Sequence, residues 1–297
     1  MPPPARTQTL HPVINETLQE YVFFNGALME STQCEISHQD RGLLYGLGLF
    51  ETMRGINGHV IRLERHLERL FHGADFLGIQ VEMDFGYWTE AVNHLLERNG
   101  LRYTDAYIRI TLTGGLAAPA LRNQPGNTLV VAHPLPEAVN RKRRGMKAFT
   151  LSPEIRRTFP HLKSLNALPT VWGIQEAQRR GYDEALFVDM IGNIREGATT
   201  NVFAMHEGRL ITPPLEMGIL PGIARDTVIR MAVNLGIPLE YGVFNVDDLV
   251  NDFEGAFLTN SLIDMAPITH LNGRPIPCSE QMRSLLHALR LTLTDLP

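Results

Sequence analysis

A lysine, a glutamate and a proline–glycine pair in the second half of the sequence could together act on a phosphorylated aldehyde. Lys163 lies in PHLKSLNALP, between a predicted strand and a predicted helix and among mostly uncharged neighbours. Loss of hydration there would lower its pKa and favour the neutral amine that attacks aldehydes. On the local sequence alone, however, a surface lysine at the start of a helix is the more ordinary interpretation.

The glutamate and the Pro-Gly pair would serve the two ends of such a molecule. Glu196 lies in GNIREGATTNVF, where a Gly-Asn turn leads into a strand, so its carboxylate could point from a loop toward a ring nitrogen. Pro221-Gly222 opens a helix and leaves the amides of Ile223 and Ala224 free to bind a phosphate. Each feature alone is weak, because a Glu after an Arg is usually a solvated pair and Pro-Gly begins many helices. Together they are what an enzyme that uses pyridoxal 5′-phosphate (PLP) needs.

These residues must be positioned by elements that mix hairpins with helices. Asn25-Gly26 and Asn57-Gly58 each separate two strand-like runs, which predicts two β-hairpins and an antiparallel sheet at the start of the chain. Apolar residues recur at helical spacing over residues 62–77, which predicts a surface helix packed on that sheet. The opposite face of this helix carries Glu64, Arg65, Glu68 and Arg69. A second helix is predicted near residues 87–98 and a strand over residues 105–113.

The composition changes at residues 134–145, which are interpreted as an interdomain linker. The four basic residues 141–144 are interpreted as solvated rather than as an anion patch. The predicted domains are a loose segment 1–19, a small N-terminal domain 20–133 and a larger C-terminal domain 146–297. In the latter, strands near residues 146–151, 184–188 and 201–206 alternate with helices near residues 168–180 and 223–235. This mixture indicates an α+β fold in both halves.

Composition narrows the class of protein. The 297 residues carry 27 Lys and Arg against 32 Asp and Glu, without a long block of like charge, which argues against a nucleic-acid or anionic-membrane surface. Cys34 and Cys278 lie far apart and lack a CxxC partner, as in a reducing compartment. No apolar run is long enough to span a bilayer, and residues 1–9 contain three prolines where a signal peptide would be apolar, so a cytoplasmic location is expected. Neither HExxH nor GxSxG occurs, so no metal site or serine hydrolase is expected.

The order of the motifs resembles a known family. KSLNALP, GYDEALFVD, EGATTNVF, GRLITPP, LPGIARD and FLTNSLIDMAPI, with DRGLLYGLGLFETMRG and RLERHLERL upstream, resemble the class IV aminotransferases. This family includes branched-chain and D-amino acid aminotransferases and aminodeoxychorismate lyase. The resemblance covers nearly the whole chain after residue 20. It implies a two-domain, PLP-dependent fold of type IV, with a small N-terminal α/β domain and a larger, β-rich C-terminal α/β domain. It further implies a homodimer whose active sites are completed by the partner chain.

The resemblance also implies roles at matching positions. Lys163 would hold the cofactor as a Schiff base and move the proton, and Glu196 would bind the pyridine nitrogen. A cation from FETMR and a set of backbone and side-chain donors would hold the cofactor's phosphate end: Arg54, Gly222, Ile223, Ala224, Asn260 and Ser261. Relatives often have Thr in place of Ala224. Branched-chain enzymes also have a Tyr where this chain has Ala167 and Leu168, and Arg156 is a weak candidate to interact there instead.

Candidate substrate residues point to different members of the family. Tyr107 and Arg109 in YIRITLTGG resemble the YIRP motif of branched-chain enzymes, and alternation would put both on one face of a strand. Arg122, in Arg-Asn-Gln, resembles the Arg-Asn-His of D-amino acid enzymes, with Gln124 in place of His, and Leu43 stands where those enzymes tend to have Tyr. Thr52 and Asn260 match residue types of the lyases, although the loop TGGLAAPALRN lacks their RGxGxRGY pattern.

Transamination is therefore favoured over lyase or D-amino acid chemistry, which remain as alternatives. The expected reaction moves an amino group between an amino acid or amine and a 2-oxo acid by a ping-pong mechanism. Leu43, Met53 and Leu116 are apolar candidates for the pocket or its lid, so a hydrophobic or branched-chain donor is expected. A PLP carrier without turnover would have lost the lysine or the glutamate, and this chain has kept both.

Overall fold

The first half of the chain folds into an antiparallel sheet covered by two helices. The computed structural model describes residues 20–81 and 84–293, so the predicted loose segment 1–19 lies outside the described residues. The strands are β1 Tyr21–Phe24, β2 Ala27–Glu30, β3 Gly48–Ile56, β4 His59–Val60, β6 Ala106–Thr113 and β8 Thr128–Pro134, in the order β2-β1-β8-β6-β3-β4. Every neighbouring pair is antiparallel, and both predicted hairpins are confirmed.

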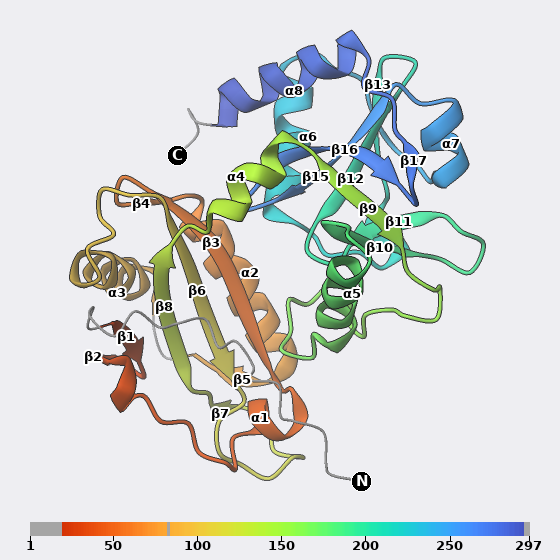
Figure 1. Cartoon of the computed structure of the whole chain (residues 1–297). Helices are drawn as coiled ribbons and strands as arrows, with labels where there is room; N and C mark the ends of the chain where they lie inside the picture. Colours follow the sequence, from red (N-terminus) through yellow and green to blue (C-terminus); the bar gives the residue numbers. More distant parts are fainter. Residues whose placement is uncertain (1–19, 82–83, 294–297) are drawn as a thin grey trace, which may run out of the picture.

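Two helices, α2 Leu63–Leu77 and α3 Phe85–Arg98, pack on this sheet (Figure 1). Their apolar faces carry Leu67, Leu70 and Val92 into one core with Met53 of β3, as the helical spacing predicted. Shorter elements complete this half, namely η1 Ser31–Gln33, α1 Arg41–Tyr45 and a small parallel pair of β5 Ile79–Gln80 with β7 Gln124–Pro125.

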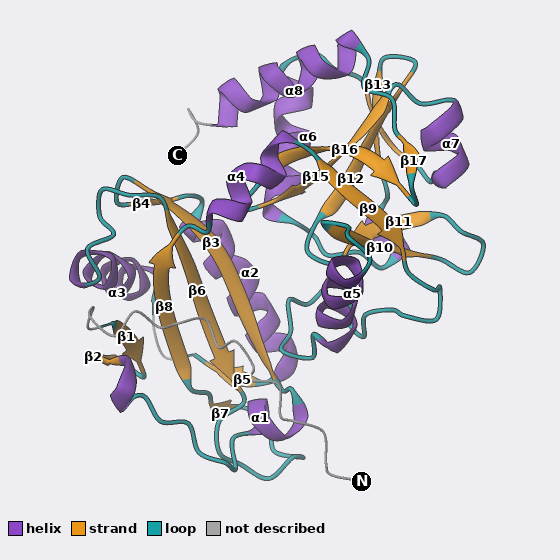
Figure 2. Cartoon of the chain, in the orientation of Figure 1, coloured by secondary structure: helices purple, strands orange, loops and turns teal. Residues whose placement is uncertain are grey.

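The second half is built on a larger mixed sheet, ordered β11-β10-β9-β16-β15-β12-β13-β14 with β17 beside β16. The strands are β9 Met146–Thr150, β10 Glu184–Val188, β11 Ile194–Gly197, β12 Asn201–His206, β13 Arg209–Thr212, β14 Leu239–Tyr241, β15 Gly255–Asn260, β16 Asp264–Leu271 and β17 Arg274–Pro275. The helical elements are α5 Leu168–Arg179, η2 Leu215–Met217, α6 Ile223–Asn234, α7 Val246–Asn251 and α8 Glu280–Leu293 (Figure 2). The predicted α+β fold is confirmed. No helix within residues 20–81 and 84–293 is both long and apolar enough to cross a membrane.

The segment between the two sheets contains a helix, and two of its four basic side chains are bound by the second half rather than solvated as the sequence predicted. Residues Glu137–Arg144 form helix α4, which connects the halves in Figure 1. The helix is stabilised because Val139 is buried and because two basic side chains of the helix donate hydrogen bonds to backbone carbonyls of the second half. Lys142 Nζ donates to the carbonyl of Asp183 at 3.0 Å, and Arg143 Nη2 donates to the carbonyl of Leu262 at 2.6 Å. The division into domains stays a prediction.

The segment that carries Lys163 pairs with the start of β3 in the other half. Leu49 and Ser164 form an isolated antiparallel bridge, in which Phe50 N donates to the Lys163 carbonyl and Leu165 N donates to the Gly48 carbonyl, both at 2.9 Å. This backbone pairing fixes the lysine at the boundary between the two halves.

Candidate active site

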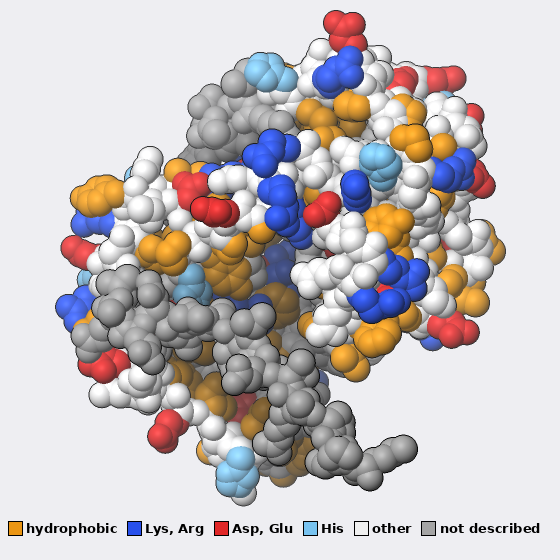
Figure 3. Space-filling model, viewed as in Figure 1, with side chains coloured by type: hydrophobic (Ala, Val, Ile, Leu, Met, Phe, Trp, Pro, Cys, Tyr) orange, Lys and Arg blue, Asp and Glu red, His pale blue; other side chains and the backbone are white. Residues whose placement is uncertain are grey.

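A cavity of about 380 Å³ lies where the two halves meet, a size suited to a small cofactor with its substrate. The first half contributes Phe50 and Thr52 from β3, Arg69 from α2, and Tyr107 and Arg109 from β6. The second half contributes the Lys163 segment, β11, the start of α6 and the turn after β15. The face shown in Figure 3 is hollowed between the halves, and Lys and Arg side chains border this hollow.

Lys163 projects its amine into this cavity, and its Nζ lies 4.6 Å from the centre of the Phe50 ring. Burial lowers the pKa of Lys163 to about 8, and the charges of Arg69, Arg157 and Arg109 add to the effect, although Glu51 opposes it. The uncharged sequence neighbours predicted this direction; Arg157 lies six residues earlier in the chain, whereas Arg69 and Arg109 come from distant segments. A useful fraction of the amine is therefore neutral near pH 8, as attack on an aldehyde requires.

Glu196 lies on the cavity wall, within strand β11 rather than in a loop, and its residue is only 3% exposed. Its Oε2 accepts from Leu220 N at 2.9 Å, and its Oε1 lies 3.5 Å from Arg157 Nη1. Burial raises the pKa of Glu196 to about 7, with Arg157 acting in the opposite direction. Glu196 is therefore a buried carboxylate and not part of the solvated Arg–Glu pair that the local sequence suggested. Its neighbour in the cavity is Arg157, whereas Arg156 is exposed and does not line the cavity.

Backbone and hydroxyl donors suited to an anion line another part of the cavity. Helix α6 begins at Ile223 after Gly222, which provides no side-chain cap, and Asp226 N makes the first bond to the Gly222 carbonyl. The amides of Ile223 and Ala224 therefore precede the hydrogen-bonded part of the helix and line the cavity, as predicted. A Cβ atom on Gly222 would lie 1.9 Å from Asn201 Oδ1, so a side chain at this position would displace Asn201.

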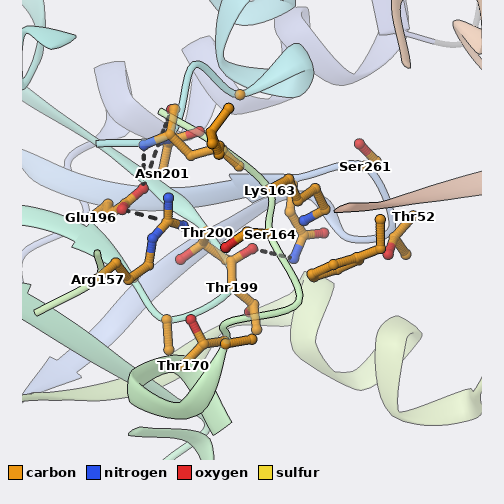
Figure 4. A pocket seen from close by; sticks show the side chains of 18 of the residues that line it. Thr52, Arg157, Lys163, Ser164, Thr170, Glu196, Thr199, Thr200, Asn201 and Ser261 are labelled. Atoms are coloured by element: carbon orange, nitrogen blue, oxygen red, sulfur yellow. Dashed lines mark hydrogen bonds and ion pairs between the residues drawn. The ribbon is translucent and has the colours of Figure 1, made fainter. Parts of the chain in front are cut away.

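The turn after β15 brings Asn260 and Ser261 to the same cavity. Asn260 Oδ1 accepts from Leu262 N and Ile263 N, both at 2.9 Å, so its side chain shapes the turn. Ser261 is a candidate hydroxyl donor to an anion. In Figure 4, Glu196 and Arg157 lie on one side of Lys163, and Ser261 and Thr52 lie on the other.

The cation at this end of the cavity is Arg69 and not the predicted Arg54. Arg54 lies outside the cavity lining, because Asp105 and Asp264 hold its guanidinium; Arg54 Nη1 lies 3.0 Å from Asp264 Oδ2. Arg69 lines the cavity and donates to the Pro221 carbonyl at 2.9 Å, next to the start of α6. The sequence placed Arg69 on the solvent face of α2, but its guanidinium is held against the Pro221 carbonyl of the second half, whereas Glu64, Arg65 and Glu68 stay exposed. The motif RLERHLERL was the signal that could have found it.

The candidate substrate residues fall into two groups. Thr52 and Arg109 are register partners on β3 and β6, and together with Tyr107 they line the cavity, as predicted. The Arg109 guanidinium stacks over the Phe50 ring, 3.9 Å from its centre. Leu43 and Arg122 do not line the cavity of this chain. Leu43 is 67% exposed in α1, and Arg122 Nη2 donates to the Phe76 carbonyl at 3.0 Å.

The prediction that Met53 and Leu116 form the pocket or its lid was wrong for this cavity. Met53 is completely buried in the core, because side chains alternate along β3 and Phe50 and Thr52 occupy the cavity face. Leu116 is exposed and lines a separate hollow with Leu44 and Tyr45.

The residues present fit PLP. A lysine with a lowered pKa, a buried carboxylate and a set of anion donors face one cavity, and PLP carries an aldehyde, a ring nitrogen and a phosphate. The donor set is rich enough for a phosphate even with Ala224 in place of a hydroxyl residue, because Arg69 adds a charged donor.

The chain is similar to proteins of one family over most of its length. The family model for class IV amino-transferases matches residues 48–271. A putative branched-chain-amino-acid aminotransferase of Methanocaldococcus jannaschii is 33% identical, covering 86% of this chain and 89% of that protein. D-alanine aminotransferase of Bacillus licheniformis is 29% identical (86% and 89% covered), and aminodeoxychorismate lyase of Bacillus subtilis is 30% identical (84% and 86% covered).

Solved structures give the same result. The branched-chain aminotransferase of Thermoproteus uzoniensis with norvaline superposes with a TM-score of 0.84 and 28% identity, covering 93% of this chain and 95% of that one. The branched-chain amino acid aminotransferase of Escherichia coli superposes with a TM-score of 0.81 and 25% identity, covering 94% of this chain and 96% of that one. A further branched-chain amino acid aminotransferase, complexed with N-(5′-phosphopyridoxyl)-L-glutamate, superposes with a TM-score of 0.82 and 25% identity, covering 94% and 95%.

Proposed function

Since the chain belongs to the class IV aminotransferases, we propose that its PLP-dependent transamination moves an amino group from a hydrophobic or branched-chain donor to a 2-oxo acid. PLP, when bound, supplies an aldehyde for the amino group and a ring that takes up electrons from the substrate carbon. The observation that carries the proposal is that Lys163, Glu196 and the anion donors beside Ser261 face one cavity.

The proposed role of Lys163 is to hold the cofactor and then to move a proton. Its lowered pKa keeps part of the amine neutral near pH 8, so that its Nζ can bond to the aldehyde or accept the α-proton of the substrate. Its backbone pairing with β3 fixes the direction from which Nζ reaches the cavity.

The proposed role of Glu196 is to hold a proton on the ring nitrogen. A protonated ring nitrogen next to this buried carboxylate would form an ion pair, which lowers the pKa that burial has raised. Arg157 and Leu220 N keep the carboxylate oriented. Arg69, Ser261 and the amides of Ile223 and Ala224 would anchor the phosphate.

The cavity wall supports a hydrophobic donor. Several of its side chains are apolar, namely Phe50, Leu162, Leu165, Val171, Ile174 and Leu262, and they leave space for an aliphatic or aromatic side chain. Tyr107 and Arg109 add polar groups on one wall, so that an acceptor with a second carboxylate also finds a cation. A transaminase needs both properties, since donor and acceptor use the same pocket in turn.

The proposed assembly is a homodimer. Exposed apolar side chains gather at α1 and the loop after β6, where Leu43, Leu44, Tyr45, Leu116 and Leu121 are all at least half exposed. An apolar surface of this kind favours contact with another protein. The proposed chain organisation keeps the predicted units 20–133 and 146–297, with α4 within the connecting segment.

Aminodeoxychorismate lyase chemistry is the second candidate. It is favoured by one observation, that Thr52 and Asn260, which match lyase residue types, both face the cavity. A D-amino acid donor has less support, because Gln124 replaces the His of those enzymes and Leu43 stands where they tend to have Tyr.

The test is a half-reaction panel on the PLP-loaded protein, with L- and D-amino acids, aromatic amines and aminodeoxychorismate added singly. The proposal predicts that a hydrophobic L-amino acid converts the visible band of the lysine-bound cofactor to that of the aminated cofactor and releases one equivalent of 2-oxo acid. Release of pyruvate from aminodeoxychorismate without accumulation of the aminated cofactor would establish the lyase instead. A visible band that no amino compound changes would contradict both.

A further inference from the structure

A chain of hydrogen-bonding side chains runs from the core of the first half to Ser261. Glu51 of β3 lies with Oε2 2.7 Å from His66 Nδ1 on α2, and His66 Nε2 lies 3.3 Å from Ser261 Oγ. Glu51 and His66 are each 1% exposed, so water does not compete for these contacts. Arg69 donates to both carboxylate oxygens of Glu51, at 2.8 and 2.7 Å. The buried pair therefore supports both Arg69 and Ser261 at the cavity.

The network fixes where the hydrogens lie before an anion binds. Burial opposes the ionisation of Glu51, but Arg69 and His66 outweigh it and hold the pKa of Glu51 at about 2. An ionised Glu51 can only accept, so His66 Nδ1 carries a hydrogen. Burial is the main influence on His66 and lowers its pKa in spite of Glu51, so the ring is neutral and its Nε2 has no hydrogen. Ser261 must then donate its hydrogen to His66.

The charged groups that face His66 favour this neutral ring. Glu51 faces it from β3 and favours a positive charge, whereas Arg69 on its own helix and Lys163 from the segment before α5 oppose that charge. Ser261 faces it from the turn after β15 and is neutral. Arg69 and Lys163 disfavour a positive charge on His66. A bound phosphate dianion would offset this effect, because its negative charge favours a protonated ring nearby.

A bound phosphate conflicts with the hydrogen position in this resting network. Ser261 has one hydrogen, and an anion's oxygen requires it. Ser261 Oγ can keep its 3.3 Å contact with His66 only if Nε2 then donates, which requires a proton on that nitrogen. We propose that His66 positions Ser261 for the cofactor phosphate and takes up one proton when an anion binds there. This inference rests on the proposed phosphate end of the cavity.

Inorganic sulfate is the appropriate probe, because it remains a dianion across the working pH range and exchanges no proton itself. The full-length, cofactor-free chain is titrated with sulfate by calorimetry at pH 8 in two buffers of different ionisation enthalpy, which counts protons taken up. All proteins carry Lys163→Arg, since Lys163 also titrates near pH 8 and arginine keeps the charge without titrating. Ser261→Ala and His66→Gln are compared in this background, so that uptake by Glu196 is common to all.

The proposal predicts that the Lys163→Arg protein, the parent in this comparison, takes up close to one proton per sulfate through this network. The Ser261→Ala and His66→Gln proteins should lack this uptake and keep only what Glu196 contributes. Sulfate affinity of the parent should fall by up to about tenfold per pH unit between pH 7 and 9, and that of the variants should change much less. If His66→Gln does not fold, Ser261→Ala, which leaves the buried pair intact, decides the comparison.

Equal uptake in all folded proteins, or sulfate binding by the parent without uptake, would overturn this inference and leave the proposed function standing. A Lys163→Arg protein that binds no sulfate would overturn this inference, and the visible band of the wild-type chain with PLP would still test the proposed function separately. If the Lys163→Arg protein takes up sulfate and a proton as described but the wild-type chain forms no visible band with PLP, the proposed function fails and this inference stands.

Discussion

Arg157 Nη1 lies 3.5 Å from Glu196 Oε1, at the carboxylate that faces the cavity. Burial raises the pKa of Glu196 to about 7, and Arg157 is the main group that limits this rise. The ionisation of a group proposed to bind the ring nitrogen therefore depends on an arginine distant from it in sequence.

Replacing Arg157 by Met should raise the pKa of Glu196 further, because burial is then opposed less. We expect the midpoint of the pH dependence of PLP binding to move upward by about one pH unit. Fluorescence titration with PLP from pH 6 to 9 measures this midpoint. Arg156→Met is the matched control, since that side chain is exposed and outside the cavity lining. An equal shift in both variants would contradict the assignment of Arg157.

Replacing Glu196 by Gln should stabilise the cofactor-free protein at high pH relative to wild type. Folding raises the pKa of Glu196 from 4.5 to about 7, so the stability this group contributes is fully present below pH 4.5 and is lost as pH rises through about 7. The difference between Glu196→Gln and wild type should change by up to about 3 kcal/mol between pH 4.5 and 8 in urea unfolding. The exposed Glu216→Gln control should show almost no such change.

Replacing Arg69 by Lys should weaken binding of PLP but not of pyridoxal. Lysine keeps the charge beside Glu51 but loses the two-pronged geometry and the bond to the Pro221 carbonyl. The expected loss is roughly 10- to 100-fold in PLP affinity. Arg65→Lys, one helical turn away and half-exposed, is the control. A similar loss for pyridoxal, which lacks the phosphate, would show that Arg69 does not bind that group.

Replacing Gly222 by Ala should disrupt the start of α6, because the new Cβ would lie 1.9 Å from Asn201 Oδ1. Asn201 also donates to the Leu220 carbonyl at 3.0 Å and lies near Glu196, so its displacement would disturb both ends of the site. We expect at least a tenfold loss of PLP affinity and a lowered melting temperature. Gly86→Ala in α3, where the nearest atom is 3.4 Å away, should be tolerated.

Local patterns predicted the elements of the fold well. The Asn-Gly turns and the helical periodicity before Leu77 report interactions between residues close in sequence, and the two hairpins and α2 are present. The pattern failed for α4, because that helix is stabilised by carbonyls of Asp183 and Leu262 in distant segments rather than by an apolar stripe of its own.

The site was predictable only where chemistry lies in a local motif. Lys163, Glu196 and the start of α6 are found from short strings, and they share one cavity. The sequence alone does not show which of the two first-half arginines, Arg54 or Arg69, reaches the cavity. Only the tertiary structure shows that two aspartates hold Arg54 and that Arg69 lines the cavity and bonds to the Pro221 carbonyl of the second half.

The assignment of Lys163 as the residue that holds the cofactor is tested most directly by borohydride reduction of the PLP-loaded protein, followed by peptide mass analysis. We predict that the reduced phosphopyridoxyl group is found on the peptide containing Lys163, and that Lys163→Ala loses both the label and the visible band. A label on any other lysine, or a protein that incorporates no cofactor, would contradict the account.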